Sequence, residues 1–203
     1  MNTKALKEAE AKFLKQYPGG FRHPALVELG KKHMMEKLEA FAKEAFSKRA
    51  FDNTDAIIDG AVRLVGRSTM VSMFEKPKFR DMLRTLPKND RETFAGALYQ
   101  LLHGKEKVGF DILVRELKKR KLAKWPLATA VQSYYRPNKD VFVKPTTTKL
   151  VIEKLKLDLT YNATPSWEFY RSYRKHILEI RSMVNENLAP NNPAFCGFMM
   201  MSL

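Results

Sequence analysis

The sequence predicts an all-α protein, mainly α-helical, built as an irregular multi-helix bundle. Three observations support this fold class. Apolar residues recur with the 3.6-residue period of helices along most of the 203 residues. Proline, glycine and capping residues punctuate these stripes. The only run with strand character is Val141–Val143, so we expect at most one very short β element there.

The N-terminal half divides into five helical segments. The first has Leu6, Ala9 and Phe13 on one face and stops at Pro18-Gly19-Gly20. The second starts at Pro24, which suits a first helical position. A capping residue near Asn53 starts the third, and Asn89 with Glu92 resembles a capping box for the fifth. The predicted helices span residues 2–17, 24–50, 55–74, 78–83 and 89–104, with Met70 and Met73 among the core residues of the third.

The C-terminal half predicts three more helices and an apolar tail. Phe110, Leu113 and Leu117 define a stripe over residues 107–121, and Trp125-Pro126 marks the next boundary. Thr146 caps a helix to about Lys156, and Thr164 with Pro165 begins a long helix that ends before Pro190. The tail, Phe195–Met201, is so apolar that we expect it to enter the core or to meet a partner.

Length and composition predict a single helical domain over residues 1–203, which could contain two sub-modules, 1–104 and 105–203. No apolar run approaches the roughly 20 residues of a membrane span, and the charged N-terminus is unlike a secretory signal. We therefore expect a cytoplasmic protein with no membrane association. Cys196 is the only cysteine, so neither an internal disulfide nor a cysteine-based metal cage can form. No cofactor is expected.

Net charge is the strongest signal in the composition. Lys and Arg number 37 against 22 Asp and Glu, which gives a formal charge of +15. A field of this sign attracts polyanions, so nucleic acid or another acidic surface is the expected partner.

A basic segment follows the fifth predicted helix. Clustered cations neutralise phosphates and release counterions, which raises affinity without selecting a sequence. The alternative is an ordinary solvated helix end, because the helix dipole favours Lys and Arg in the last turn. The candidate nucleic-acid-binding residues here are Lys105, Lys107, Arg115, Lys118, Lys119, Arg120, Lys121 and Lys124.

A second candidate lies in residues 146–173, where two predicted helices suggest a helix-turn-helix. The second helix carries Arg171, Arg174 and Lys175 as candidate nucleic-acid contacts. The intervening segment, 157–163, is longer than the usual turn of about three or four residues, which favours a packed helical hairpin instead. Trp167 and Tyr170 would then be core residues rather than stacking platforms for bases.

Other chemistry-bearing residues are sparse. His33 with Glu36 and His176 with Glu179 share helix faces, but ion pairs are a better interpretation than a metal site. Cys196 has no base nearby in the sequence and two phenylalanines close to it, which favours an inert thiol. No phosphate-binding loop or hydrolase motif is present, so the sequence assigns no catalytic residues and leaves enzymatic activity undecided.

From Trp125 onward the chain resembles an uncharacterised bacterial group of basic helical proteins. The residues that carry the resemblance are Trp125-Pro126, Phe142-Val143-Lys144-Pro145-Thr146, Leu159-Thr160-Tyr161, Pro165-Ser166-Trp167, Tyr170 and the apolar tail after Pro193. The resemblance implies a bacterial, helical protein but no established activity.

The sequence thus favours a module that binds nucleic acid or another macromolecule without catalysis. An enzyme acting on nucleic acid is one alternative. The other is an interaction module that uses the methionine-rich tail to contact a protein partner or a second copy of the chain.

Overall fold

Eleven α-helices and three short 3-10 turns make up the protein, and no strand is present. The computed structural model describes all 203 residues. The all-α prediction is confirmed. None of the helices combines the length and the apolar character needed to cross a membrane. The helices are α1 (Thr3–Gln16), α2 (Pro24–Lys32), α3 (Met35–Ala45), α4 (Thr54–Arg67), α5 (Glu75–Arg84), α6 (Lys88–His103), α7 (Glu106–Lys119), α8 (Trp125–Tyr135), α9 (Pro145–Lys154), α10 (Trp167–Arg181) and α11 (Asn192–Ser202).

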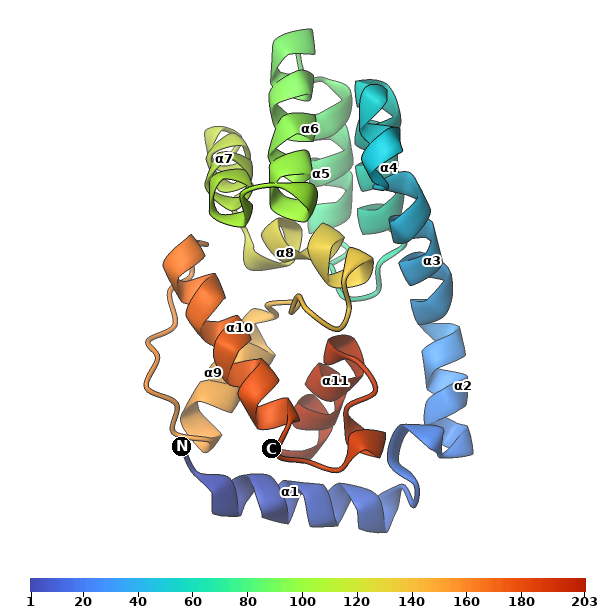
Figure 1. Cartoon of the computed structure of the whole chain (residues 1–203), viewed down its shortest axis with the longest axis vertical. Coiled ribbons are helices and arrows are strands. Elements are labelled where there is room, and N and C mark those ends of the chain that lie inside the picture. Colours follow the sequence, from blue (N-terminus) through green and yellow to red (C-terminus); the bar gives the residue numbers. More distant parts are fainter.

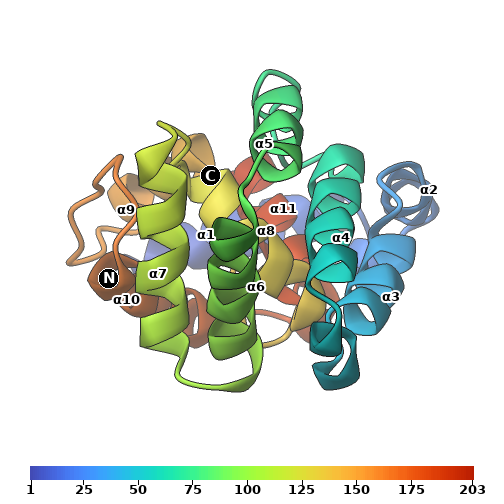
Figure 2. The same ribbon diagram turned by 90° about the horizontal axis from the view of Figure 1, so that it is seen from above.

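The helices form an upper and a lower group joined by α8 (Figure 1). Helices α4, α5, α6 and α7 lie in the upper group, whereas α9, α10 and α11 lie below α8, with α1 along the bottom. Seen from above, α7, α6 and α4 lie side by side (Figure 2). One cluster of 50 buried apolar residues extends through both groups. The chain therefore has a single continuous core.

Helix α8 was not predicted, because it is buried on every side. Trp125, Ala128, Val131 and Tyr134 are all at most 3% exposed, so the helix has no polar face to create a 3.6-residue stripe. The hydroxyls of Thr129 and Ser133 bond to backbone groups, whereas the buried side-chain amide of Gln132 has no hydrogen-bond partner. The Thr129 hydroxyl donates to the Trp125 carbonyl at 2.8 Å and accepts from the Val143 amide at 3.1 Å.

That last bond belongs to the segment for which the sequence suggested a β element. Val141, Phe142 and Val143 are buried but form no strand. A strand needs a neighbour that offers backbone partners, and an all-helical surrounding supplies none. The short β element that the sequence allowed at residues 141–143 is therefore absent.

Two predicted helices are shorter than expected. The predicted helix 24–50 breaks at Met34, which has the left-handed φ of 54° and separates α2 from α3. The predicted helix 55–74 ends at Arg67 because the Ser68 hydroxyl accepts a bond from the Met70 amide and pairs with the Tyr134 hydroxyl at 2.9 Å. Met73 is 73% exposed, so its assignment to the core was wrong.

Helix starts also differ slightly from expectation. Asn89 lies inside the first turn of α6, because the helix begins at Lys88 after Pro87. Ser166, not Thr164, caps α10 by accepting a hydrogen bond from the Phe169 amide at 3.3 Å. These shifts of one to three residues are ordinary at helix ends.

The apolar tail enters the core, one of its two expected locations. It forms α11, in which Phe195, Phe198 and Met199 are fully buried. The Phe198 ring meets that of Phe13 edge to face at a centroid distance of 5.2 Å, which joins α11 to α1. Most of the apolar surface of the tail is therefore used within the chain.

Candidate nucleic-acid interface

The C-terminal end of α7 gathers cations around one buried carboxylate. Glu116 has a side-chain exposure of only 4%, and Lys119 Nζ lies 2.8 Å from its Oε1. Arg115 and Arg120 each approach the same carboxylate at 3.7 Å. Arg120 also pairs with Asp90 at the start of α6. Because two carboxylates, Glu116 and Asp90, serve three cations, a positive excess remains at this end of α7.

Three exposed lysines lie beside these paired cations. Lys118, Lys121 and Lys124 are exposed and have no carboxylate within 4.0 Å. Lys124 lies near the half-buried Glu75, whose pKa is raised by burial despite the opposing charge of Lys124. We call these six cations the Glu116 cluster: Arg115, Lys118, Lys119, Arg120, Lys121 and Lys124.

The other two candidates on this segment lie at the opposite end of α7. A helix of this length spans about 20 Å, so Lys105 and Lys107 are well separated from the Glu116 cluster. Lys107 pairs with Asp111 at 2.8 Å and with Glu168 of α10 at 3.1 Å. These hydrogen bonds raise the pKa of Lys107. Lys105 is exposed and unpaired.

The α10 candidates divide by the direction in which their side chains point. Arg171 and Lys175 are exposed. Arg174 is only 14% exposed and lies between two carboxylates, with Nη1 2.9 Å from Asp140 Oδ1 and Nη2 3.0 Å from Glu106 Oε2. The structure thus gives Arg174 a position inside an ion-pair network and leaves Arg171 and Lys175 open to solvent.

This network joins α7, α8 and α10. The fully buried Asp140 accepts hydrogen bonds from Arg136, Arg174 and the Tyr170 hydroxyl. Arg136 also donates to the carbonyls of Leu101 and Leu102 at the end of α6. Burial raises the pKa of Glu106, but the bond from Lys139 and the charges of Arg174 and Arg136 outweigh that effect and leave its pKa lowered.

The aromatic residues of the proposed helix-turn-helix lie in the core, as the hairpin interpretation predicted. Trp167 is 9% exposed and Tyr170 is fully buried, with the Phe110 ring stacked on Tyr170 at 5.1 Å. The connection between α9 and α10 covers residues 155–166, longer than the sequence suggested. Neither aromatic ring is available to stack on a base.

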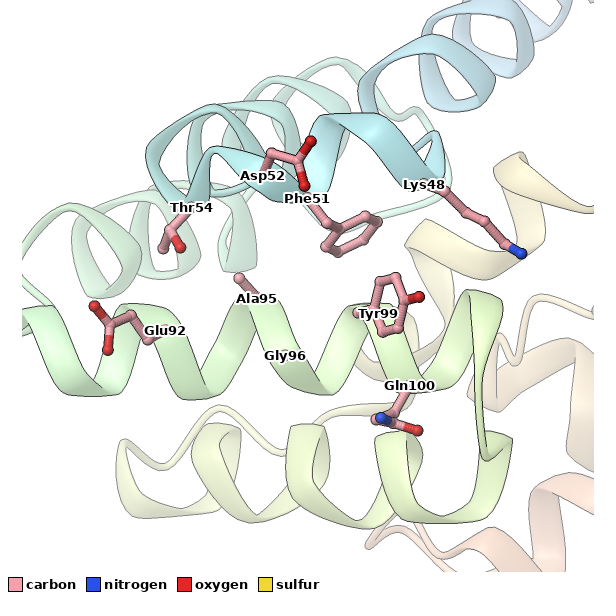
Figure 3. A pocket seen from close by; sticks show the side chains of 9 residues that line it. All are labelled: Lys48, Phe51, Asp52, Thr54, Glu92, Ala95, Gly96, Tyr99 and Gln100. Carbon is pink, nitrogen blue, oxygen red and sulfur yellow. The ribbon is translucent and has the colours of Figure 1, made fainter.

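A groove that the sequence did not reveal lies on the other side of α6. It has a volume of about 440 Å³ and runs between α6 and the 3-10 turn Lys48–Asp52 that precedes α4 (Figure 3). Phe51 and Tyr99 extend toward each other from opposite walls. Their ring centroids are 5.3 Å apart at an interplanar angle of 76°. The two residues are 48 positions apart, so no local pattern indicates that they meet.

The aromatic row continues past the groove to the end of α6. The His103 ring lies 5.5 Å from both Phe51 and Tyr99 and 5.4 Å from Tyr135. Its Nε2 is 2.8 Å from the Phe46 carbonyl, which can only accept, so this nitrogen carries the proton. His103 is thereby held in one orientation.

The remaining candidate residues do not form a grouped site. No three His, Cys, Asp or Glu side chains are grouped closely enough to hold a metal ion. His33 meets the Thr69 hydroxyl at 3.0 Å through Nδ1. Burial raises the pKa of Cys196 to about 12, so its thiol stays protonated at neutral pH.

Comparison with known proteins adds no assignment. No family model, no curated protein and no solved structure matches the chain.

Proposed function

We propose that the protein binds nucleic acid without catalysing a reaction on it, through phosphate contacts made by the Glu116 cluster. The observation that carries this proposal is the sharing of Glu116 by three cations beside three unpaired lysines. A phosphate backbone entering this surface meets Lys118, Lys121 and Lys124, which have no carboxylate within 4.0 Å, and three cations that share two carboxylates. The net charge of +15 supports the same class of partner.

The arrangement favours contacts with the backbone over sequence recognition. Lysine ammonium groups on flexible stems act as point charges toward phosphates, whereas base readout needs side chains held against base edges. Binding should therefore have little sequence preference and should weaken as salt rises. The proposal includes a cytoplasmic location, which the single cysteine supports because disulfides are rare in reducing compartments.

The test is fluorescence anisotropy with labelled oligonucleotides of mixed sequence, on the wild type and on a variant carrying Lys118→Gln, Lys121→Gln and Lys124→Gln. These side chains form no ion pairs, so their replacement should leave the fold intact, which circular dichroism can check. We expect affinity to fall by about tenfold or more at low salt.

A matched control removes the same charge at the far end of the molecule. It carries Lys4→Gln, Lys12→Gln and Lys15→Gln on α1, whose side chains are exposed and which lies opposite α7 in Figure 1. The control should bind nearly as well as the wild type. Equal losses in the two variants would show that binding follows total charge, and no binding by the wild type would refute the proposed function.

A further inference from the structure

The groove between α6 and the turn Lys48–Asp52 has one aromatic end and one acidic end. Tyr99 is 37% exposed, a high value for an aromatic side chain on a core helix, and Phe51 is half-buried opposite it. Thr54 and Glu92 lie toward the other end, and Asp52 lies beside Phe51 with its carboxylate turned away from α6, as Figure 3 shows. The groove therefore offers flat apolar surface and hydrogen-bond acceptors in one open cavity.

Space beside Tyr99 is left by a glycine on the same helix. Gly96 lies three residues before Tyr99 and therefore about one turn away on the same face. A Cβ atom at Gly96 would have no heavy atom within 4 Å. Because Phe51 meets Tyr99 edge to face, the pair does not close into a stack, and a planar ring can lie against it above Gly96.

Positive charge is in excess only at the aromatic end, because at the other end Lys88 and Arg91 lie among the more numerous carboxylates of Asp52, Asp55 and Glu92. The Lys48 side chain extends past Tyr99 into solvent in Figure 3. Lys105 is tied to the same end, because its backbone amide donates to Gln100 Oε1 at 3.0 Å and Gln100 lines the groove. Phosphates are attracted to this end and repelled from the carboxylate of Glu92 at the other end. That carboxylate can instead accept hydrogen bonds from the amino groups of bases.

We propose that this groove holds an unpaired base of a single-stranded nucleic acid, stacked on Tyr99 and in contact with Phe51, with the adjoining phosphates beside Lys48 and Lys105. The inference rests on the proposed function, and it specifies the form of nucleic acid. Base stacking on aromatic side chains is available only where bases are not enclosed in a duplex. Single strands should therefore bind more tightly than duplexes of the same sequence.

The decisive variant fills the groove without disturbing the core. Gly96→Leu places a side chain in open space on a helix, where leucine is a better helix former than glycine. Gly66→Leu is the matched control, since Gly66 is an exposed glycine of α4 that also has nothing within 4 Å. We expect Gly96→Leu to weaken binding of single-stranded DNA and RNA by about 5- to 150-fold, the range for loss of one stacked base. The affinity of Gly96→Leu for duplexes should be unchanged. The control Gly66→Leu should bind both single strands and duplexes as the wild type does.

A direct readout of stacking comes from Tyr99→Trp. The native Trp125 and Trp167 are 1% and 9% exposed, so a new indole at position 99 would report on the groove. Single strands should quench its fluorescence more strongly than duplexes do.

The outcomes separate the two proposals. If the wild type binds single strands and duplexes equally and Gly96→Leu changes neither, the groove is not a base site but the proposed function stands. If the wild type binds no nucleic acid at low salt, both proposals fail.

Discussion

Glu106 shows at the scale of one residue how charge holds this fold together. Its carboxylate forms ion pairs with Arg136 and Lys139, at and after the end of α8, and with Arg174 of α10. Its pKa is lower than that of an ordinary glutamate. A carboxylate whose pKa is lower in the folded state than in the unfolded state adds stability above its unfolded pKa, and that stability is lost as the pH falls through the folded value.

We therefore expect Glu106→Gln to reduce the pH dependence of stability in acid. Wild-type stability should decline between about pH 5 and pH 3, and the variant should decline less because one of the linked protonations is gone. At neutral pH the variant should be less stable by about 1–3 kcal/mol, because three cations lose a charged partner. Urea denaturation at several pH values measures both effects.

Glu8→Gln is the control for this experiment. Glu8 is an exposed glutamate, with a side-chain exposure of 68% and a pairing distance of 4.0 Å to Lys4, so its replacement should leave the curve unchanged. If stability falls with pH equally in the wild type and in Glu106→Gln, ionisation of Glu106 does not contribute to stability.

The sequence could indicate which residues carry charge, but not which of them remain free. Arg171, Arg174 and Lys175 look equivalent in the sequence, yet Arg174 meets Glu106, 68 positions away. Six of the eight candidates around α7 do lie together, because they follow one another on one helix end and its extension. The groove was missed because Phe51 and Tyr99 are brought together only by tertiary packing.

At the scale of elements, α6 and α7 are the most closely packed pair. A Cβ atom on Gly109 would lie 2.2 Å from the Leu101 amide nitrogen and 2.6 Å from the Ala97 carbonyl oxygen. Backbone atoms of a buried helix cannot move aside cheaply. Glycine at this position therefore sets the distance between the basic helix and the helix that lines the groove.

Gly109→Ala should accordingly destabilise the protein by about 1–3 kcal/mol, the usual cost of overpacking. Gly66→Ala makes the same substitution in open space on α4 and should stabilise by about 0.5–1 kcal/mol through helix propensity. Opposite shifts in the urea midpoint are expected. A shift of the same sign in both variants would contradict the close packing of α6 and α7.

Helix α11 provides a second prediction at this scale. Phe198→Ala should cost about 3–5 kcal/mol, because its ring is fully buried against Phe13 and Phe195. Met201→Ala, at a position 39% exposed, should change the melting temperature little. A small effect of Phe198→Ala would mean that the tail does not belong to the core in solution.

The elements that the sequence predicted share a physical property that the others lack. Helices such as α1, α6 and α7 have one face in water, and their apolar stripes follow from that exposure. Helices α8 and α11 are apolar on nearly all sides and produce no stripe. The break at Met34 and the early end of α4 at Ser68 depend on local geometry and on a bond to Tyr134, which periodicity does not encode.

At the scale of the molecule, the Glu116 cluster and the groove are parts of one helical layer. Helices α7, α6 and α4 lie side by side (Figure 2). Cations of α7 lie on one side of α6 and the groove lies on the other. The aromatic end of the groove lies beside Lys105, about 20 Å along α7 from the Glu116 cluster. A single strand that occupies both sites must therefore extend along α7 as well as across α6.

The measurement that tests the central claim most directly is the salt dependence of duplex binding, for the wild type and for the variant with Lys118, Lys121 and Lys124 replaced by Gln. Each phosphate contact contributes about −0.9 to the slope of log affinity against log salt. We expect a steep negative slope for the wild type and a slope shallower by about 2 to 3 for the variant. Equal slopes would contradict the account, because they would show that the phosphates are not bound by the Glu116 cluster.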